Sequence, residues 1–178
     1  MATNQALVEK IYQWLTGGAV PGAANRGAGA MGVRVDRAAA ADPQNVWQTL
    51  FTIAGCLIAV TGLIGVRTII QAGGASTMQF RHSVGPTVLD DGTAVITANA
   101  VDTLYAHVGD AGSPITVGVA GVGISLAKLV AGSAWYGSFP LAILMAGNIQ
   151  VTMTAAAGTG STRYILTYIP LGDGVTVV

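Results

Sequence analysis

Charge is scarce in this sequence. Of its 178 residues, only 9% are charged and 52% are hydrophobic, whereas soluble domains carry about 25% charged residues. The eight acidic side chains balance the eight basic ones, so no net field attracts nucleic acid or a membrane surface. A protein with so neutral a surface tends to self-associate. We therefore expect partner subunits to cover much of it.

Cysteine and targeting signals are equally rare. The single cysteine, Cys56, excludes a disulfide within the chain and a multi-cysteine metal site. It lies in an apolar run without charged neighbours, so we expect a small buried hydrophobe and not an activated thiolate. The N-terminus has no basic segment followed by an apolar run, as a secretory signal would have. This predicts synthesis in the cytoplasm.

The sequence is also poor in groups for catalysis. Gly27 to Gly32 match GxGxxG, but the strand before and the helix after that define a nucleotide site are not expected here. His82 and His107 lie in strand-like stretches without the HxH or HExxH spacing of a metal site, and Asp90-Asp91-Gly92 indicates a hairpin turn. Catalysis usually needs several titratable side chains in one place. We predict no enzymatic activity, no metal and no cofactor.

Two other classes of protein remain as alternatives. The stretch from Val46 to Val66 has no charge, so a small membrane protein using residues 46–66 is one alternative. Its glycines, its many β-branched residues and the absence of a flanking Lys/Arg cluster favour strands over a membrane helix. A carbohydrate-binding module is the other alternative, because aromatic side chains could form a sugar platform: Tyr105, Trp135, Tyr136, Phe139, Tyr164 and Tyr168.

Residues 45–178 have the pattern of a β-domain. Short segments rich in β-branched residues alternate with Gly-rich turns, and no helices are interleaved. Asn148 to Thr154 alternate, with Ile149, Val151 and Met153 on one face and Gln150 and Thr152 on the other. We expect Thr162 to Pro170 to return as its partner in a C-terminal antiparallel hairpin. The fold predicted is mainly β, an antiparallel β-sandwich or jelly roll.

Residues 1–44 differ from the rest of the chain. A short helix is expected over residues 4–15, with an apolar stripe at helical spacing. A Gly/Ala-rich, irregular arm follows over residues 17–44; free in solution it cannot bury enough surface to offset its ordering entropy. We expect this helix and arm to contact a neighbouring subunit or a capsid through these residues: Leu7, Ile11, Trp14, Leu15, Arg26, Arg34 and Arg37.

Three segments of residues 45–178 resemble small virion proteins of tailed bacteriophages, above all capsid decoration (cement) proteins. They are NVWQTLFTIAG followed by LIAVTGLIGVRTIIQAG, then DTLYAHVGD, and then the ending LMAGNIQVTMTAAAGTGSTRYILTYIPLGDGVTVV. That ending is the most specific part: a threonine-rich strand, a Gly-rich loop, an aromatic strand and Pro-Leu-Gly-Asp-Gly. Residues 1–44 have no counterpart.

The resemblance implies a β-sandwich or jelly-roll subunit on the capsid exterior of a virion, made in the host cytoplasm. Its implied partners are itself, as a homotrimer, and a major capsid protein that it ties into a stabilised lattice. It implies no active site, no small-molecule substrate and no nucleic acid. A head-fibre or tail accessory subunit of a phage particle remains the alternative within this class, because copy number and position in the particle separate the two.

Overall fold

A computed structural model of the chain describes residues 32–71, 75–85, 87–107, 115–118, 142–154 and 160–178. The helix expected over residues 4–15, with its stripe Leu7, Ile11, Trp14 and Leu15, lies outside these residues. So does Arg26.

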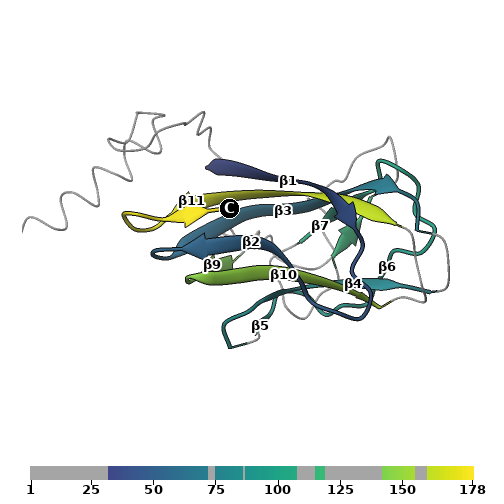
Figure 1. Cartoon of the computed structure of the whole chain (residues 1–178), viewed down its shortest axis with the longest axis horizontal. Coiled ribbons are helices and arrows are strands. Elements are labelled where there is room, and N and C mark those ends of the chain that lie inside the picture. The colour runs from purple at the N-terminus through teal and green to yellow at the C-terminus, as the bar shows by residue number, and fades with distance from the viewer. Residues whose placement is uncertain (1–31, 72–74, 86, 108–114, 119–141, 155–159) are drawn as a thin grey trace, which may run out of the picture.

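The described strands form two antiparallel sheets packed into a sandwich (Figure 1). Sheet A has the order β1 (Val33–Ala41), β11 (Ser161–Pro170), β3 (Ile58–Ile69), β7 (Leu104–Ala106) and β8 (Thr116–Val117), and β9 (Ala142–Leu144) pairs with the start of β3. Sheet B has the order β12 (Thr176–Val177), β2 (Gln48–Ala54), β10 (Gly147–Thr154), β4 (Thr77–His82) and β5 (Thr87–Val88), and β6 (Ala94–Val95) also pairs with β4. The mainly β, sandwich-like prediction is thus confirmed.

Alternating side chains build the core between the sheets. Ile149, Val151 and Met153 of β10 are fully buried, while Gln150 and Thr152 between them are only half-buried, as their period of two requires. Phe80 of sheet B meets Tyr164 of sheet A edge to face, with ring centroids 6.2 Å apart. The face assignment for residues 148–154 is confirmed.

The expected C-terminal hairpin is wrong. β10 pairs with β2 and β4 in sheet B, whereas β11 pairs with β1 and β3 in sheet A. The chain therefore crosses between the sheets after Thr154. Packed sheets lie only about 10 Å apart, so a short connection reaches the opposite sheet as readily as the adjacent strand.

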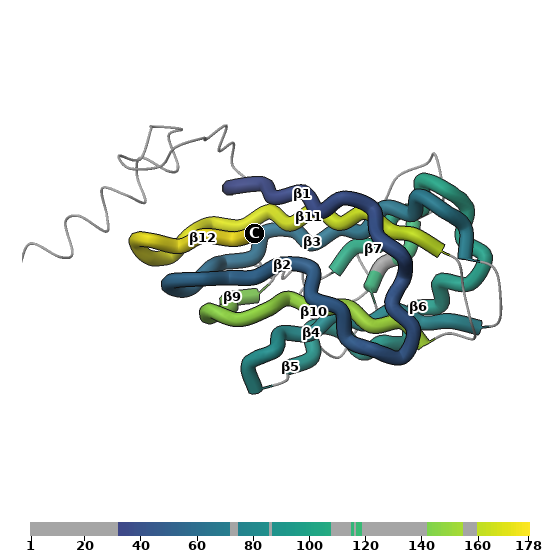
Figure 2. The backbone as a smooth tube through the Cα atoms, in the orientation of Figure 1, coloured from purple at the N-terminus to yellow at the C-terminus, as the bar shows by residue number. Residues whose placement is uncertain are grey.

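The irregular arm expected up to residue 44 is wrong for residues 33–41, which form strand β1. Val33 lies opposite Tyr168 and Ala41 opposite Ser161 in β11. Val33 and Val35 pack against the core, so the sandwich begins at Val33 and not at residue 45. After β1 the chain crosses to sheet B and enters β2, as the dark-blue part of the tube shows (Figure 2).

Residues 46–66 form strands, not a membrane helix. β2 and the first part of β3 occupy most of this stretch, joined by a turn at Gly55, where φ is +90°. The described ranges contain strands, turns and loops, and none of their residues belongs to a helix long and apolar enough to cross a membrane.

Asp90-Asp91-Gly92 does not make the expected hairpin. β5 and β6, on either side of it, both pair with β4, at Arg81–His82 and at Thr77–Met78 respectively. The segment is therefore a loop that interrupts the edge beside β4, and its first residue, Asp90, is buried.

Candidate functional site

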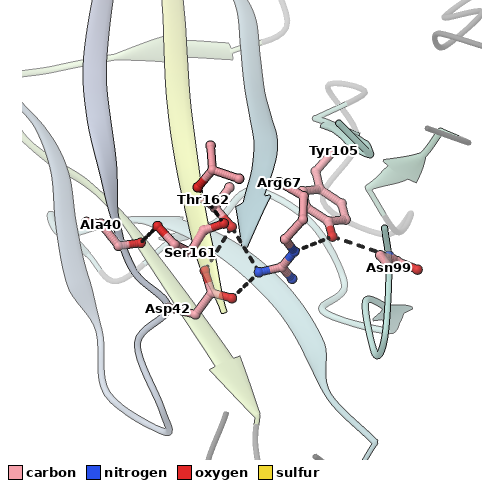
Figure 3. A network of polar contacts seen from close by, with 8 residues as sticks. Ala40, Asp42, Arg67, Asn99, Tyr105, Ser161 and Thr162 are labelled. Atoms are coloured by element: carbon pink, nitrogen blue, oxygen red, sulfur yellow. Dashed lines mark hydrogen bonds and ion pairs between the residues drawn. The ribbon is translucent and has the colours of Figure 1, made fainter. Parts of the chain in front are cut away.

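The densest group of polar side chains is buried at the end of the sandwich where β1 ends and β11 begins (Figure 3). Arg67 of β3 is fully buried and forms an ion pair with Asp42, which follows β1. The Arg67 Nε donates a hydrogen bond to the hydroxyl of Tyr105 at 3.0 Å, and the Thr162 hydroxyl donates to Asp42 Oδ1 at 2.8 Å. Three strands of sheet A and the β1–β2 connection thus meet at one guanidinium.

The pairing of β11 with β3 determines where the side chains of this network lie. Thr162 lies opposite Arg67 in the β11–β3 pairing, so both side chains point into the core. Asp42 is held beside them because its backbone N–H donates to the carbonyl of Gly160 at 3.0 Å. A Cβ at position 160 would lie 2.3 Å from the Asp42 carboxylate and 2.7 Å from the guanidinium. Glycine is therefore required there by close packing.

Burial governs the electrostatics of this network. Burial alone would lower the pKa of Arg67, but the charge of Asp42 and the hydrogen bonds to Asp42 and Tyr105 outweigh it and raise the pKa. Burial also raises the pKa of the Tyr164 hydroxyl. The Arg67 guanidinium therefore stays charged and the Tyr164 phenol stays neutral near neutral pH.

The network ties the end of β1 to two other strands of sheet A, because Asp42 pairs with Arg67 of β3 and accepts a hydrogen bond from Thr162 of β11. The Arg67 Nη2 and both side-chain amide atoms of the nearby Gln71 are buried without a hydrogen-bond partner, which is costly in a core.

Two further titratable groups are buried, in sheet B. Burial raises the pKa of Asp90 to about 6, against the opposing effect of hydrogen bonds from the backbone N–H groups of Phe80 and Gly92. Burial lowers the pKa of His82. His107 is also buried, but it follows β7 in sheet A. Within the described ranges, no three His, Cys, Asp or Glu side chains gather as metal ligands.

Cys56 is exposed, contrary to the buried position we expected. It lies in the turn between β2 and β3, where its side chain contacts Gly172. The opposite sheet does not cover a residue in this turn, so the thiol is exposed. The aromatic sugar-binding platform is also wrong for those of its residues that the structure describes. Tyr105, Tyr164 and Tyr168 are buried in the core, while Trp135, Tyr136 and Phe139 lie outside the described residues.

The opposite end of sheet A exposes large apolar side chains. Leu171 N–H donates to the Leu57 carbonyl at 2.9 Å, and Ile58 lies opposite Leu144 at the end of the β3–β9 pairing, so Leu57 and Met145 are the next residues beyond that pair. We call this group the apolar end patch: Leu57, Ile143, Met145 and Leu171, with exposed fractions of 41%, 60%, 53% and 49%. It lies at the end of the sandwich where β9 and β11 finish, on the left in Figure 1.

The outward faces of the two sheets also differ. On sheet A, the side chains that point away from the core on β3 and β11 are mixed: Ile64, Val66, Ile165 and Ile169 are apolar, whereas Thr68, Arg163 and Thr167 are polar or charged. On sheet B, the outward side chains of β2, β4 and β10 are polar: Thr49, Thr52, Gln79, Arg81, Gln150 and Thr152. The outward face of sheet A, next to the apolar end patch, therefore carries more large apolar side chains than that of sheet B.

The candidate interface arginines in the described region lie on β1. Arg34 is exposed and makes two hydrogen bonds to Asp36, at 2.8 and 2.7 Å, and the hydrogen bond to Arg34 lowers the pKa of Asp36. Arg37 points inward and donates to the Leu50 carbonyl of sheet B at 2.8 Å. Arg37 thus bridges the two sheets of its own chain.

Sequence reasoning missed both the network and the apolar end patch. Arg67 is the one charge in the apolar run from Leu57 to Gly73, and a charge in a buried strand requires a partner. The sequence therefore indicated that Arg67 needs a partner, although it did not identify Asp42 as that partner. Comparisons with known proteins add no assignment, because no family model, no curated protein and no solved structure matches the chain.

Proposed function

We propose that the chain is a structural subunit of a bacteriophage particle, a capsid decoration protein that binds the outer capsid lattice and stabilises it. The single observation that carries the proposal is the apolar end patch on an otherwise charge-poor β-sandwich. Contiguous exposed apolar side chains mark protein contact sites. The resemblance of residues 45–178 to decoration proteins supplies the kind of partner.

The chemistry of the patch fits a protein surface. Its four side chains are presented at the end of three adjacent strands, so one flat contact could cover them together. Burying a large apolar side chain contributes about 1.5–3 kcal/mol each, before the cost of association. Repetition of a modest contact over a lattice adds avidity, which suits a subunit present in many copies.

Residues 1–31 are the second element of the proposal. Their apolar stripe and Arg26 would contact a neighbouring subunit, and we propose a homotrimer as the unit that binds the capsid. Because Arg34 and Arg37 belong to strand β1, the segment that we propose to contact a neighbouring subunit is limited to residues 1–31.

The test is attachment of the chain to purified capsids. Leu57→Asp and Met145→Asp place charges in the patch at exposed positions, so both variants should fold and lose capsid binding in a co-sedimentation assay. Val95→Asp is the matched control, because Val95 is 61% exposed but lies on β6 of sheet B; it should bind like the wild type. Cryo-electron microscopy of the particles should place the density on the outer capsid.

Failure of the wild-type chain to bind any capsid surface would contradict the proposal. Density at the tail or at a fibre base would indicate an accessory subunit of the particle instead of a capsid decoration protein. Wild-type binding by both patch variants would show that another surface makes the contact.

A further inference from the structure

Strand β1 leaves one edge of sheet A unpaired within the described part of the chain. It pairs with β11 on one side, and no described strand pairs with its other side. It spans nine residues and contains neither proline nor lysine, two of the residues that commonly protect such edges. Its free N–H and C=O groups are a template for one more strand.

The regular part of β1 is short and symmetric. The register with β11 is continuous from Val33 to Arg37 and then shifts before Ala40. Val35 is the middle residue of that stretch. An added antiparallel strand would therefore pair best with residues 33–37.

The charges on this stretch are self-complementary. Arg34 and Asp36 lie opposite Thr167 and Ile165 of β11 and point away from the core, with side chains 57% and 47% exposed. If two β1 strands pair antiparallel about a two-fold axis at Val35, Arg34 of each copy lies opposite Asp36 of the other. An axis at Arg34 or at Asp36 would instead oppose like charges, which is destabilising.

We propose that β1 pairs antiparallel with β1 of a second copy, centred on Val35, so that the two A sheets join into one. This contact between copies is additional to capsid attachment and uses neither the apolar end patch nor residues 1–31. A five-residue strand pairing is a small interface, so we expect a weak, transient dimer in free solution. Assembly on a lattice would favour it by avidity.

Charge reversal with mixing tests the pairing. In Arg34→Asp, two carboxylates face each other at both ends of the contact; in Asp36→Arg, two guanidinium groups do. Each variant alone should dimerise at least about tenfold more weakly than the wild type at low ionic strength. Mixed in equal amounts, the two variants should form a heterodimer, because every facing pair is then opposite in charge.

The mixing experiment separates contacts between copies from contacts within one strand. In both single variants the pair between positions 34 and 36 of the same chain is lost, and mixing does not restore it. The double variant, with Arg34→Asp and Asp36→Arg together, should dimerise like the wild type. Sedimentation velocity over micromolar to millimolar concentrations measures all five samples: the wild type, the two single variants, their mixture and the double variant.

Cross-linking provides a second measurement. In a Cys56→Ser background, Val35→Cys places two cysteines on the proposed axis, with Cα atoms about 4.5–5.5 Å apart, within disulfide range. Ala38→Cys is the control, because three residues from the axis its two copies would lie about 20 Å apart. Mild oxidation should cross-link the first variant and not the second.

The contact is overturned if the wild type stays monomeric at every concentration, or if the single variants dimerise as well as the wild type. Failure of the mixed variants to associate would overturn it as well. A trimer insensitive to these substitutions would overturn it while supporting the trimer of the proposed function. Capsid co-sedimentation of the monomeric variants keeps the two proposals separate.

Discussion

Removal of the Asp42 carboxylate should be among the most damaging single changes in the described sandwich. Asp42→Asn keeps the shape of the side chain but leaves the buried charge of Arg67 without its counter-ion. Arg67 and Asp42 side chains are 0% and 2% exposed, so water does not replace the lost carboxylate. Breaking a buried pair in this way costs about 3–5 kcal/mol. Single domains are stable by only about 5–15 kcal/mol, so the variant should lose at least about a fifth of its stability.

Urea denaturation followed by circular dichroism measures this loss. Asp36→Asn is the matched control, because it removes a carboxylate from an Arg–Asp pair that is exposed to solvent. Solvent screening leaves such pairs with little influence on stability, so the midpoint of the control should remain nearly unchanged. The reasoning fails if Asp42→Asn costs no more than Asp36→Asn.

A double-mutant cycle tests the cause. Arg67→Met alone leaves the Asp42 carboxylate buried and unpaired, and should also be strongly destabilising. Combined with Asp42→Asn, it removes both charges, so the double variant should be more stable than the sum of the two losses predicts. Additive losses would show that the two side chains do not act as a pair.

Three further predictions concern other parts of the sandwich. Val151→Asp should unfold the domain, because it buries an unpaired charge, while Thr152→Asp should melt near the wild type; the reverse order in a thermal scan would contradict the register. In Asp90, the folded-state pKa is raised from 3.8 to about 6, so the stability present below pH 4 should fall by about 3 kcal/mol as the pH rises through 6. Asp90→Asn should lose that dependence in urea titrations at several pH values, and an unchanged pH profile would exclude Asp90 as its source. Deletion of residues 1–31 should leave a folded domain by circular dichroism, whereas deletion of 1–44 should not, because it removes β1 and Asp42; equal stability of the two would contradict the anchoring role.

The strand content and the inward faces could be predicted because they depend on local alternation. Ile149, Val151 and Met153 repeat every second residue, and only a strand turns such a repeat into one apolar face. The same logic applied to Val33-Arg34-Val35-Asp36 would have found β1. The Gly/Ala-rich residues before it and the alanine run after it, both poor strand formers, obscured that signal.

The pairing of strands could not be predicted in the same way. β10 and β11 each have one buried face, and this pattern is identical whether two consecutive strands are neighbours in one sheet or lie in opposite sheets. Asp42 and Arg67 are 25 residues apart, and they meet only because sheet A places the end of β1 next to the end of β3 by way of β11. Local sequence therefore contains the signal for Arg67, a charge in an apolar run, but nothing that points to the residue that neutralises it.

The Asp42–Arg67 pair is also important because β1 and β11, although neighbours in sheet A, are far apart in the sequence. β1 has one neighbour among the described strands, β11, whose Thr162 lies 120 residues beyond Asp42. Closing so long a loop costs conformational entropy. The packing of a single edge strand, with only small side chains at residues 38–41, offsets little of this cost. The ion pair fixes one end of β1 and the inward valines, Val33 and Val35, fix the other. β1 held at both ends keeps its regular stretch, residues 33–37, beside β11, and no described strand covers its other edge. Pairing with a second copy requires this geometry.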